Sequence, residues 1–230
     1  MIYAVSDIHG CYDKYKELLK RISLDDTLYV LGDVIDRGPD GFKIMLDMVR
    51  RPNVLNLMGN HEAMALSALS QMLNAMEKSG GIEFAGDAAK AVKLWFYNGG
   101  EPSLADFLWL NEEQERIVWE YMRNMPLYRE VEAGGQRFVL VHGGLENCSP
   151  SRPLDDYAPD EILWCRPEED TVYYPDKYVV FGHTPVQLVK PGKPAEIYRR
   201  NKLINIDCGC VFRGGRLGCL CLDTMEEIYV

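Results

Sequence analysis

The chain contains four histidines, and each follows a short apolar segment of the kind that forms a buried strand. They are His9, His61, His142 and His183. One histidine taken alone is as often structural as functional. Independent structural histidines would be distributed over helices and loops, whereas all four of these histidines follow predicted strands. Imidazole ligates transition metals and transfers protons near neutral pH, so the pattern predicts a metal-binding or acid–base site.

Carboxylate and amide side chains accompany these histidines. Asp7 lies two residues before His9, so in an extended segment both side chains point to the same side. Asp33 and Asn60 follow the next two apolar segments. Such a mixture of nitrogen and oxygen ligands suits Zn, Fe or Mn. A shared carboxylate could hold two ions about 3.5–4 Å apart, as in two-metal phosphoryl chemistry. Because the set contains no cysteine, a purely structural zinc site is disfavoured.

Three apolar segments must position the first of these side chains. They cover residues 2–5, 28–31 and 54–58, and helical patterns occupy about 12–22 and 40–50 between them. This βαβαβ order predicts parallel strands with right-handed crossovers. Ligand sites in such sheets lie at the carboxyl ends of the strands, where the polar clusters fall. Asp40 has the place of an N-cap for the second helix.

The middle of the chain has a helical pattern from about residue 62 to 125. Gly80-Gly81 interrupts it, a second helix is expected over 83–97, and Asn111 with Gln114 has the spacing of a capping box. We expect this stretch to be a helical insertion or cap beside the mouth of the site. The aromatic run Trp95-Phe96-Tyr97 fits either a core or an interface, so the oligomeric state is left open.

The last part of the chain is predicted to be β-rich. Strands over 127–132 and 136–141 flank Gly134-Gly135, which is a hairpin signal. A further strand covers 178–182, residues 149–159 form a loop, and short strands of a meander follow from about 195. The expected fold class is α+β, an α/β/β/α four-layer sandwich. Its two packed mixed β-sheets are flanked by helices in a single domain over residues 1–230.

Composition narrows the class of protein. The chain has 230 residues, of which 47% are hydrophobic, and this is ordinary for a globular domain. Its formal net charge of -10 disfavours stable nucleic-acid binding, because the phosphate backbone is negative. No apolar run has the length of a membrane span, and the N-terminus lacks the basic region of a signal peptide. We therefore expect a cytoplasmic location with mostly reduced thiols.

Four cysteines near the C-terminus form a pattern of their own. Residues 207–212 and 216–222 flank Gly214-Gly215, so we expect a hairpin in which Cys210 faces Cys219 and Cys208 faces Cys221. Period two then places all four thiols on one face. They could form a redox pair or a thiolate metal site, or pack as small apolar side chains. We favour packing, because one hairpin face cannot easily surround an ion tetrahedrally.

Several motifs now resemble a known family when taken in order. They are Asp7-x-His9-Gly10, Gly32-Asp33-x-x-Asp36-Arg37-Gly38, Gly59-Asn60-His61-Glu62, His142 and Gly182-His183. The chain is identified by this resemblance as a member of the calcineurin-like metallophosphoesterases, and more closely of their phosphoprotein phosphatase branch. The compact size and Trp164-Cys165-Arg166 are similar to the small bacterial and phage serine/threonine protein phosphatases.

The resemblance implies two divalent metal ions. Asp7, His9 and Asp33 would hold the first ion. Asp33, Asn60, His142 and His183 would hold the second, with Asp33 bridging both. Manganese is the first expectation, with iron, zinc, nickel or cobalt as alternatives.

The resemblance also implies the catalytic roles. A bridging hydroxide would attack phosphorus in line, Arg37 and Arg166 would grip the phosphoryl oxygens, and His61 would protonate the leaving oxygen. Asp36 would orient His61. The alternatives are a surface ion pair between Asp36 and Arg37, and a solvated ion pair for Arg166. Glu62 is expected only to favour the dipole at a helix start.

Three functions follow from these expectations. The first is a metal-dependent phosphomonoesterase acting on phosphoserine or phosphothreonine in proteins, with phosphotyrosine as a further target. The second is a hydrolase of diadenosine tetraphosphate or related dinucleotides. The third is a metallophosphoesterase-like scaffold without catalysis. Asp36 favours the first, since symmetrical tetraphosphatases tend to have Asn there. The expected partner is a phosphorylated protein or small phosphoester, with no nucleic acid and no membrane.

Overall fold

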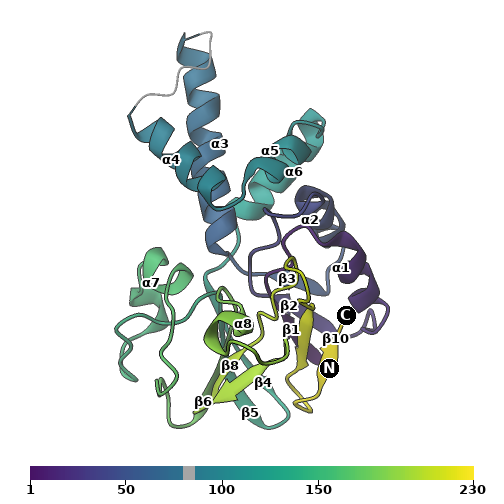
Figure 1. Cartoon of the computed structure of the whole chain (residues 1–230), viewed down its shortest axis with the longest axis vertical. Helices are drawn as coiled ribbons and strands as arrows, with labels where there is room; N and C mark the ends of the chain where they lie inside the picture. Colours follow the sequence, from purple (N-terminus) through teal and green to yellow (C-terminus); the bar gives the residue numbers. More distant parts are fainter. Residues whose placement is uncertain (80–85) are drawn as a thin grey trace.

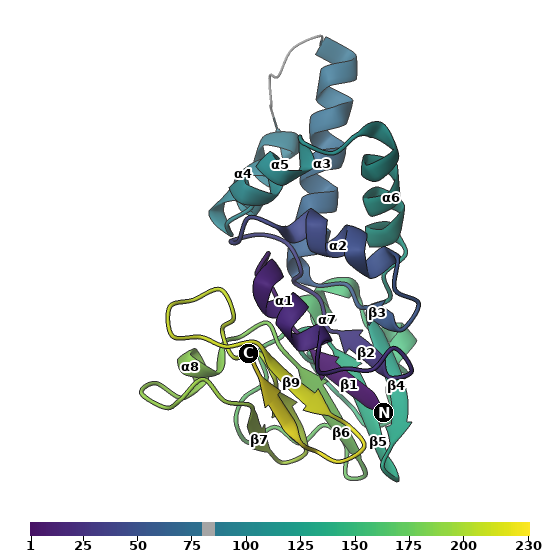
Figure 2. The same cartoon turned by 90° about the vertical axis from the view of Figure 1, so that its right-hand side faces the viewer.

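A computed structural model of the chain shows two five-stranded sheets packed face to face with helices outside them (Figures 1 and 2). The structure describes residues 1–79 and 86–230. The predicted α+β sandwich of two mixed sheets is confirmed.

The first sheet has the strand order β10-β9-β1-β2-β3. Strands β1, β2 and β3 are parallel, as predicted, and helices α1 and α2 lie in their crossovers. The expected helix over 12–22 ends early, at Leu19. Asp40 occupies the N-cap position of α2, but its side chain makes no cap hydrogen bond. The bounds are β1 Ile2–Val5, α1 Tyr12–Leu19, β2 Thr27–Val30, α2 Gly41–Val49, β3 Val54–Asn56, β9 Gly218–Cys221 and β10 Glu227–Tyr229.

The second sheet has the order β4-β5-β6-β8-β7. Its first two strands form the predicted hairpin, with Ala133 opposite Gln136 across the two glycines. Strands β5, β6 and β8 are parallel, so their carboxyl ends meet at one edge. The bounds are β4 Tyr128–Ala133, β5 Gln136–Val141, β6 Lys177–Phe181, β7 Tyr198–Arg200 and β8 Leu203–Asn205.

Three apolar clusters hold these layers together. Alternate residues of both sheets meet in the cluster between them, for example Leu31, Leu140 and Ile204. Helices α1 and α2 pack on the first sheet through residues such as Tyr15 and Phe42. The outer face of the second sheet is covered by η1 Leu154–Asp156, α7 Pro159–Leu163 and neighbouring loops. The short helix α8 Val186–Val189 follows β6.

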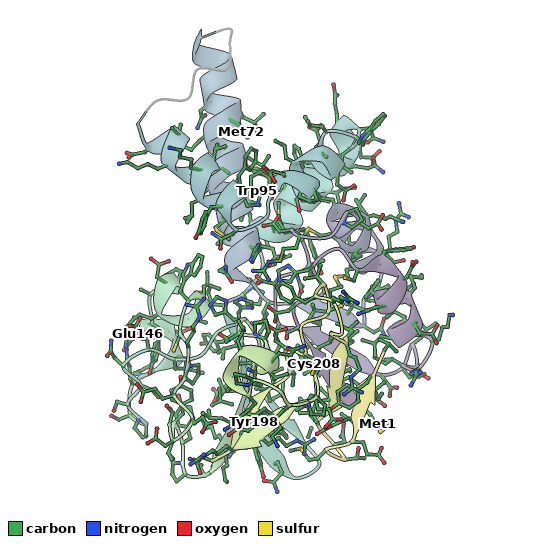
Figure 3. The ribbon with its side chains drawn as sticks, in the orientation of Figure 1. Met1, Met72, Trp95, Glu146, Tyr198 and Cys208 are labelled. Carbon is green, nitrogen blue, oxygen red and sulfur yellow. The ribbon has the colours of Figure 1, made fainter. Side chains whose placement is uncertain are left out.

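Four helices between β3 and β4 extend away from the sheets (Figure 1). They are α3 Asn60–Ser79, α4 Asp87–Tyr97, α5 Glu101–Phe107 and α6 Glu112–Arg123. The capping box of Asn111 with Gln114 is confirmed at the start of α6, whereas α5 was not predicted. The expected break at Gly80-Gly81 and the expected helix start at 83 lie outside the described residues. Trp95 is fully buried and Tyr97 is exposed; Figure 3 places Trp95 among these helices.

The predicted cysteine hairpin is wrong. Residues 207–217 form an irregular loop, in which the Arg216 amide donates to the Cys208 carbonyl. Strand β9 pairs instead with β1 and β10, because the N-terminal strand offers it a longer apolar partner. The late strands are therefore divided between the two sheets and do not form one meander.

The four thiols do not share one face either. Cys208 lies in the cluster between the sheets, while Cys210, Cys219 and Cys221 lie in the cluster under the helices. All four are buried free thiols, which agrees with a packing role.

Within the described residues, none of the helices combines the length and the apolar character needed to cross a bilayer.

Candidate active site

The residues predicted to form a site come together at the carboxyl ends of the parallel strands. Loops after β1, β2, β5 and β6 carry most of them, and the first turn of α3 supplies Asn60 and His61. Nearly all are buried, and the six proposed metal ligands are at most 8% exposed. Burial of so many polar groups is costly unless they are paired or bind a ligand, so their convergence indicates a functional site.

Asp33 lies at the centre of this cluster. Its Oδ1 is 3.4 Å from Nε2 of His142, and its Oδ2 is 3.7 Å from Nε2 of His9 and of His61. Two groups of possible metal ligands share this carboxylate. The first contains His9, Asp33 and His61, and the second contains Asp33, His142 and His183. Within each group the ligand atoms lie within 4.8 Å of one another. These separations suit a cation bound between the atoms, since Zn–N and Zn–O bonds are about 2 Å long.

Two buried ligand atoms have no hydrogen-bond partner among the described residues. They are Oδ1 of Asp7 and Nε2 of His183. The other oxygen of Asp7 accepts a hydrogen bond from the His183 amide at 3.0 Å. A buried polar atom without a partner costs about 1–3 kcal/mol. Because Oδ1 of Asp7 lies 3.9 Å from Nε2 of His9, beside the other metal-ligating groups, divalent metal ions fit the donors that are present.

Backbone carbonyls orient two of the imidazoles. Nδ1 of His9 lies 2.8 Å from the Ile35 carbonyl oxygen, and Nδ1 of His142 lies 2.7 Å from that of Leu31. Each carbonyl requires a proton on Nδ1, which leaves a lone pair on Nε2 that can accept a hydrogen bond or bind a cation. Metal-ligating histidines commonly have such a partner on the other nitrogen. Asn60 Oδ1 lies 2.8 Å from Nε2 of His142 and 2.9 Å from Nδ1 of His183.

A histidine–carboxylate pair lies beside this cluster. Nδ1 of His61 is 2.6 Å from Oδ2 of Asp36, and both side chains are buried. The indole of Trp95 donates to the same carboxylate, and the Asp36 amide donates to Oγ of Ser103 at 2.7 Å. The pair is therefore held from both sides by helices α4 and α5. The alternative of a surface ion pair between Asp36 and Arg37 is wrong.

Burial dominates the titration of these groups in the metal-free protein. It raises the pKa of Asp36 to about 7 and lowers the pKa of His61 well below its usual 6.5, with the Arg37 charge as a further cause for His61. Burial also raises the pKa of Asp33 and lowers the pKa of His183 to about 2. Bound cations would favour the ionised carboxylate and the neutral imidazole.

Arg37 contacts imidazoles rather than a carboxylate. Its Nη1 is 2.7 Å from Nε2 of His9, and its Nη2 is 3.0 Å from Nε2 of His61. The guanidinium also lies 5.6 Å from the ring centroid of Phe212. Because one nitrogen lone pair serves one partner, a metal ion on His9 requires the guanidinium to move away. The arginine is thus next to the place where a phosphoryl group would bind.

The expectation for Glu62 is wrong. Its carboxylate is fully buried and accepts hydrogen bonds from the amides of Asp33, Val34, Ile35 and Gly59 at 2.8 to 3.3 Å. It therefore holds the loop after β2 against the start of α3. Such charge-assisted bonds are stronger than a dipole interaction at an exposed helix end.

The backbone at the site is not extended, contrary to the expectation for Asp7 and His9. Their φ angles are 52° and 46°, and those of Asp33, Asp36 and His183 are also positive. The side chains of Asp7 and His9 still converge, with 3.9 Å between Oδ1 and Nε2. Left-handed conformations of non-glycine residues cost about 1–3 kcal/mol each and gather at functional sites.

Arg166 is exposed, and no hydrogen bond or ion pair of its side chain is found among the described residues. Its charge is one of the causes that lower the pKa of His183, after burial and His142. Trp164 lies edge-on to the His183 ring, with 5.8 Å between centroids.

Four further residues of the site were not predicted as such. They are Glu62, Trp95, Ser103 and Asp207. Only Glu62 lies in a sequence motif. Trp95 and Ser103 come from helices whose packing the sequence does not show, and Asp207 is a buried carboxylate whose pKa is raised by burial and by Asp7.

A calcineurin-like phosphoesterase profile matches residues 1–202. The chain belongs to this family. The resemblance of the motifs is therefore confirmed, and the family is one of metallophosphoesterase hydrolases. The family relationship also makes divalent metal ions the expected cofactors of the clusters around Asp33.

Curated relatives have two kinds of name. The chain is 30% identical to a symmetrical bis(5'-nucleosyl)-tetraphosphatase of Acidovorax ebreus over 63% of this chain, and the match spans only 44% of that relative. It is 27% identical to the asymmetrical tetraphosphatase PrpE of Geobacillus thermodenitrificans, covering 98% of this chain and 92% of the relative. It is 28% identical to serine/threonine-protein phosphatase 1 of Salmonella typhimurium, covering 94% and 89%.

Solved structures show the same fold. A crystal structure described as a putative diadenosine tetraphosphatase matches the whole chain and 92% of its own, with a TM-score of 0.68 and 22% identity. A protein serine/threonine phosphatase from Saccharomyces cerevisiae matches with a TM-score of 0.57 and 16% identity, over 100% of this chain and 78% of its own.

Proposed function

We propose that the protein is a two-metal phosphomonoesterase that acts on phosphorylated serine and threonine side chains of proteins, with phosphotyrosine as a further target. The observation that carries the proposal is the pair of buried donor groups that share Asp33, one of which contains His61, the partner of Asp36. This arrangement combines sites for two cations with a proton donor on one face of the cluster.

The proposed first ion is held by Asp7, His9 and Asp33, and the second by Asp33, Asn60, His142 and His183. Bound divalent ions, with manganese as the first candidate, supply positive charge and a water of lowered pKa. The unpartnered Oδ1 of Asp7 supports the first assignment, and the approach of His183 Nδ1 and His142 Nε2 to Oδ1 of Asn60 supports the second.

The other side chains act on the substrate. The His61–Asp36 pair, with 2.6 Å between Nδ1 and Oδ2, would hold one proton near neutral pH, since burial raises the pKa of Asp36 to about 7. His61 would pass this proton from Nε2 to the leaving oxygen, which leaves a neutral imidazole and the Asp36 carboxylate. Arg37 leaves the imidazoles and donates to the phosphoryl oxygens together with Arg166, since guanidinium groups match phosphate geometry. Helices α3 to α6 form the cap that selects the substrate, and α4 connects the cap to the pair through Trp95.

A second candidate substrate is a dinucleoside polyphosphate. It is favoured by relatives named tetraphosphatases, of which the PrpE protein matches nearly the whole chain. Asp36 favours the phosphoprotein substrate instead, because the resemblance of the motifs implies Asn at this position in symmetrical tetraphosphatases. The two candidates share the metal clusters and differ in what surrounds them.

The test begins with chelator-stripped protein and p-nitrophenyl phosphate, with and without manganese. We expect metal to restore activity and His61→Ala to reduce it, while Asp87→Asn on the exposed face of α4 leaves it unchanged. No hydrolysis with any divalent metal would contradict the proposal. Turnover of a phosphopeptide against diadenosine tetraphosphate then decides the substrate class, and preference for the dinucleotide would replace the first candidate by the second.

A further inference from the structure

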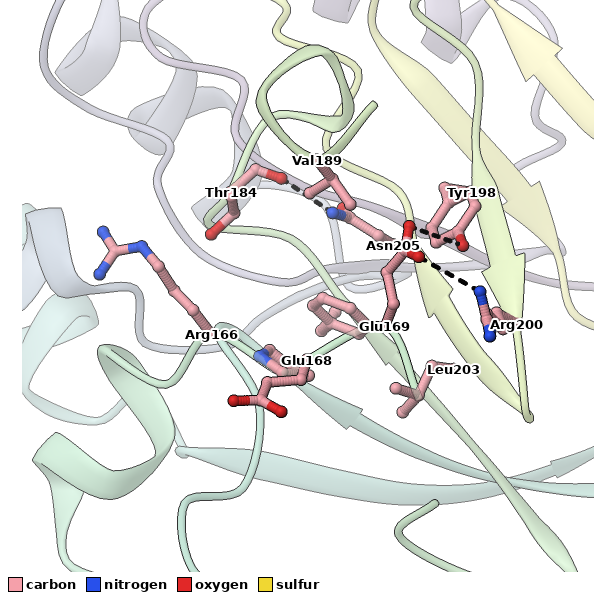
Figure 4. Close-up of a pocket in the computed structure, with 11 residues that line it drawn as sticks. Arg166, Glu168, Glu169, Thr184, Val189, Tyr198, Arg200, Leu203 and Asn205 are labelled. Carbon is pink, nitrogen blue, oxygen red and sulfur yellow. Dashed lines mark hydrogen bonds and ion pairs between the residues drawn. The ribbon is translucent and has the colours of Figure 1, made fainter. Parts of the chain in front are cut away.

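A cavity of about 50 Å³ lies beside the candidate active site (Figure 4). Phe181 and Asn205, the last residues of β6 and β8, line it, and His183 follows Phe181 by two residues. Phe181 and Leu203 belong to the outer face of the second sheet. The cavity is therefore at the same strand ends that carry the proposed metal ligands.

The walls of the cavity are largely apolar. Phe181, Val189, Tyr198 and Leu203 contribute to them. One polar exception is Thr184, whose buried Oγ1 has no hydrogen-bond partner among the described residues, while its carbonyl accepts from Asn205. The cavity can therefore take an apolar group and offer it, or the chain that carries it, one hydrogen bond.

Arg166 connects the cavity to the site. It lines the cavity near Thr184, and Figure 4 shows its guanidinium extending away from the other lining residues. Trp164, two residues before Arg166, has its ring 5.8 Å from that of His183, and Thr184, the residue after His183, lines the same cavity as Arg166. Arg166 therefore belongs to a segment that contacts the proposed metal ligands. A substrate whose phosphate is held by Arg166 would bring its neighbouring atoms to the cavity.

The charges at the rim bear on the kind of occupant. Lys190 and Arg200 share the single carboxylate of Glu169, which also accepts from the Tyr198 hydroxyl. Glu168 adds an exposed negative charge, so these two cations face two carboxylates. Apart from Arg166, this group has no surplus positive charge for further phosphates of a dinucleotide, whereas the apolar walls suit an uncharged side chain of a peptide. The rim and the walls together favour a peptide.

On the basis of the proposed phosphoprotein phosphatase function, we propose that this cavity is a subsite for an uncharged apolar side chain that flanks the phosphorylated residue of a protein substrate. The apolar walls supply selectivity, because filling a hydrophobic pocket discriminates between side chains by about 10-fold or more. The subsite selects among phosphoproteins without contributing to the hydrolysis of a small ester.

The experiment uses metal-loaded full-length protein and phosphopeptides that differ at one position, leucine against serine, at each of the two residues on either side of the phosphoserine. Val189→Trp fills the cavity from its rim. Leu188→Trp is the matched control, because Leu188 is 72% exposed on the same helix and does not line the cavity. Hydrolysis of p-nitrophenyl phosphate reports the catalytic site alone.

We expect the wild type to prefer leucine at one position by about 10-fold in kcat/KM. Val189→Trp should abolish this preference and Leu188→Trp should retain it, with p-nitrophenyl phosphate turnover unchanged in both. A wild type without preference, or a preference that survives Val189→Trp, overturns the subsite alone. Loss of p-nitrophenyl phosphate turnover in the wild type overturns the proposed function. If only diadenosine tetraphosphate is cleaved and Val189→Trp impairs it, the occupant is a nucleobase and the peptide proposal is wrong.

Discussion

The indole Nε1 of Trp95 lies 2.9 Å from Oδ2 of Asp36, although 59 residues separate them. The indole is fully buried and packs against Gly100, where a Cβ would lie 2.6 Å from the ring. Helix α4 is therefore part of the active site as well as of the proposed cap. The indole N–H of Trp95 gives the Asp36 carboxylate a second partner besides His61, and this contact fixes the orientation of the His61–Asp36 pair.

Trp95→Phe should reduce activity more than stability. The substitution keeps an aromatic ring but removes the donor, which costs about 1.5–3 kcal/mol for a bond to a charged group. We expect kcat on a phosphopeptide to fall by about 10-fold with little change in KM. The control is Trp109→Phe, because Trp109 is 88% exposed. Equal effects of the two variants would contradict the positioning role of Trp95.

Glu62→Gln should destabilise the protein strongly. The neutral amide replaces one acceptor oxygen by a donor and weakens the bonds from four buried amides, so we expect a loss of about 2–4 kcal/mol. Glu101→Gln is the control, since Glu101 is an exposed first-turn acid of α5. Urea unfolding of the chelator-treated proteins measures both. If Glu62→Gln lowers the free energy of unfolding no more than Glu101→Gln does, Glu62 acts only on the helix dipole.

Gly182→Ala should weaken metal binding. A Cβ at this position would lie 2.1 Å from Oδ2 of Asp7, so the carboxylate must move from its place beside His183. We expect the affinity for manganese to fall by about 10–100-fold, the range for changes around metal ligands. Calorimetric titration of the stripped protein measures the affinity, and circular dichroism confirms the fold. Unchanged affinity would show that Asp7 is not required as a ligand.

Asp36→Asn should change how stability depends on pH. Burial raises the pKa of Asp36 to about 7 from 3.8, so the folded metal-free protein keeps a proton that the unfolded chain has lost between these values. The resulting stabilisation is complete below about pH 4 and is lost as pH rises through 7. Between pH 4.5 and 8, the stability of the wild type relative to Asp36→Asn should fall by about 3 kcal/mol. Urea unfolding in chelator measures it, and a difference that rises with pH would contradict the raised pKa.

The sequence alone was sufficient to predict the parallel strands, the sandwich of two sheets and the strand ends at which the candidate site lies. Apolar segments that end in polar clusters report local structure, and parallel strands bring their carboxyl ends together whatever the packing elsewhere. For this reason Asp7, Asp33 and the four histidines could be grouped before the structure was available, and motifs in family order identified their chemistry.

Only the tertiary structure decided which side chains support that group. Trp95 and Ser103 reach Asp36 because α4 and α5 pack over the loop after β2, and no local pattern contains this contact. Glu62 changed role because its burial depends on the fit of α3 against that loop. The cysteine hairpin failed for a similar reason: pairing of β9 with the distant strand β1 outweighed the local turn signal. Local conformational propensities contribute little free energy, so the burial of apolar side chains in long-range contacts decides the strand pairing where the two conflict.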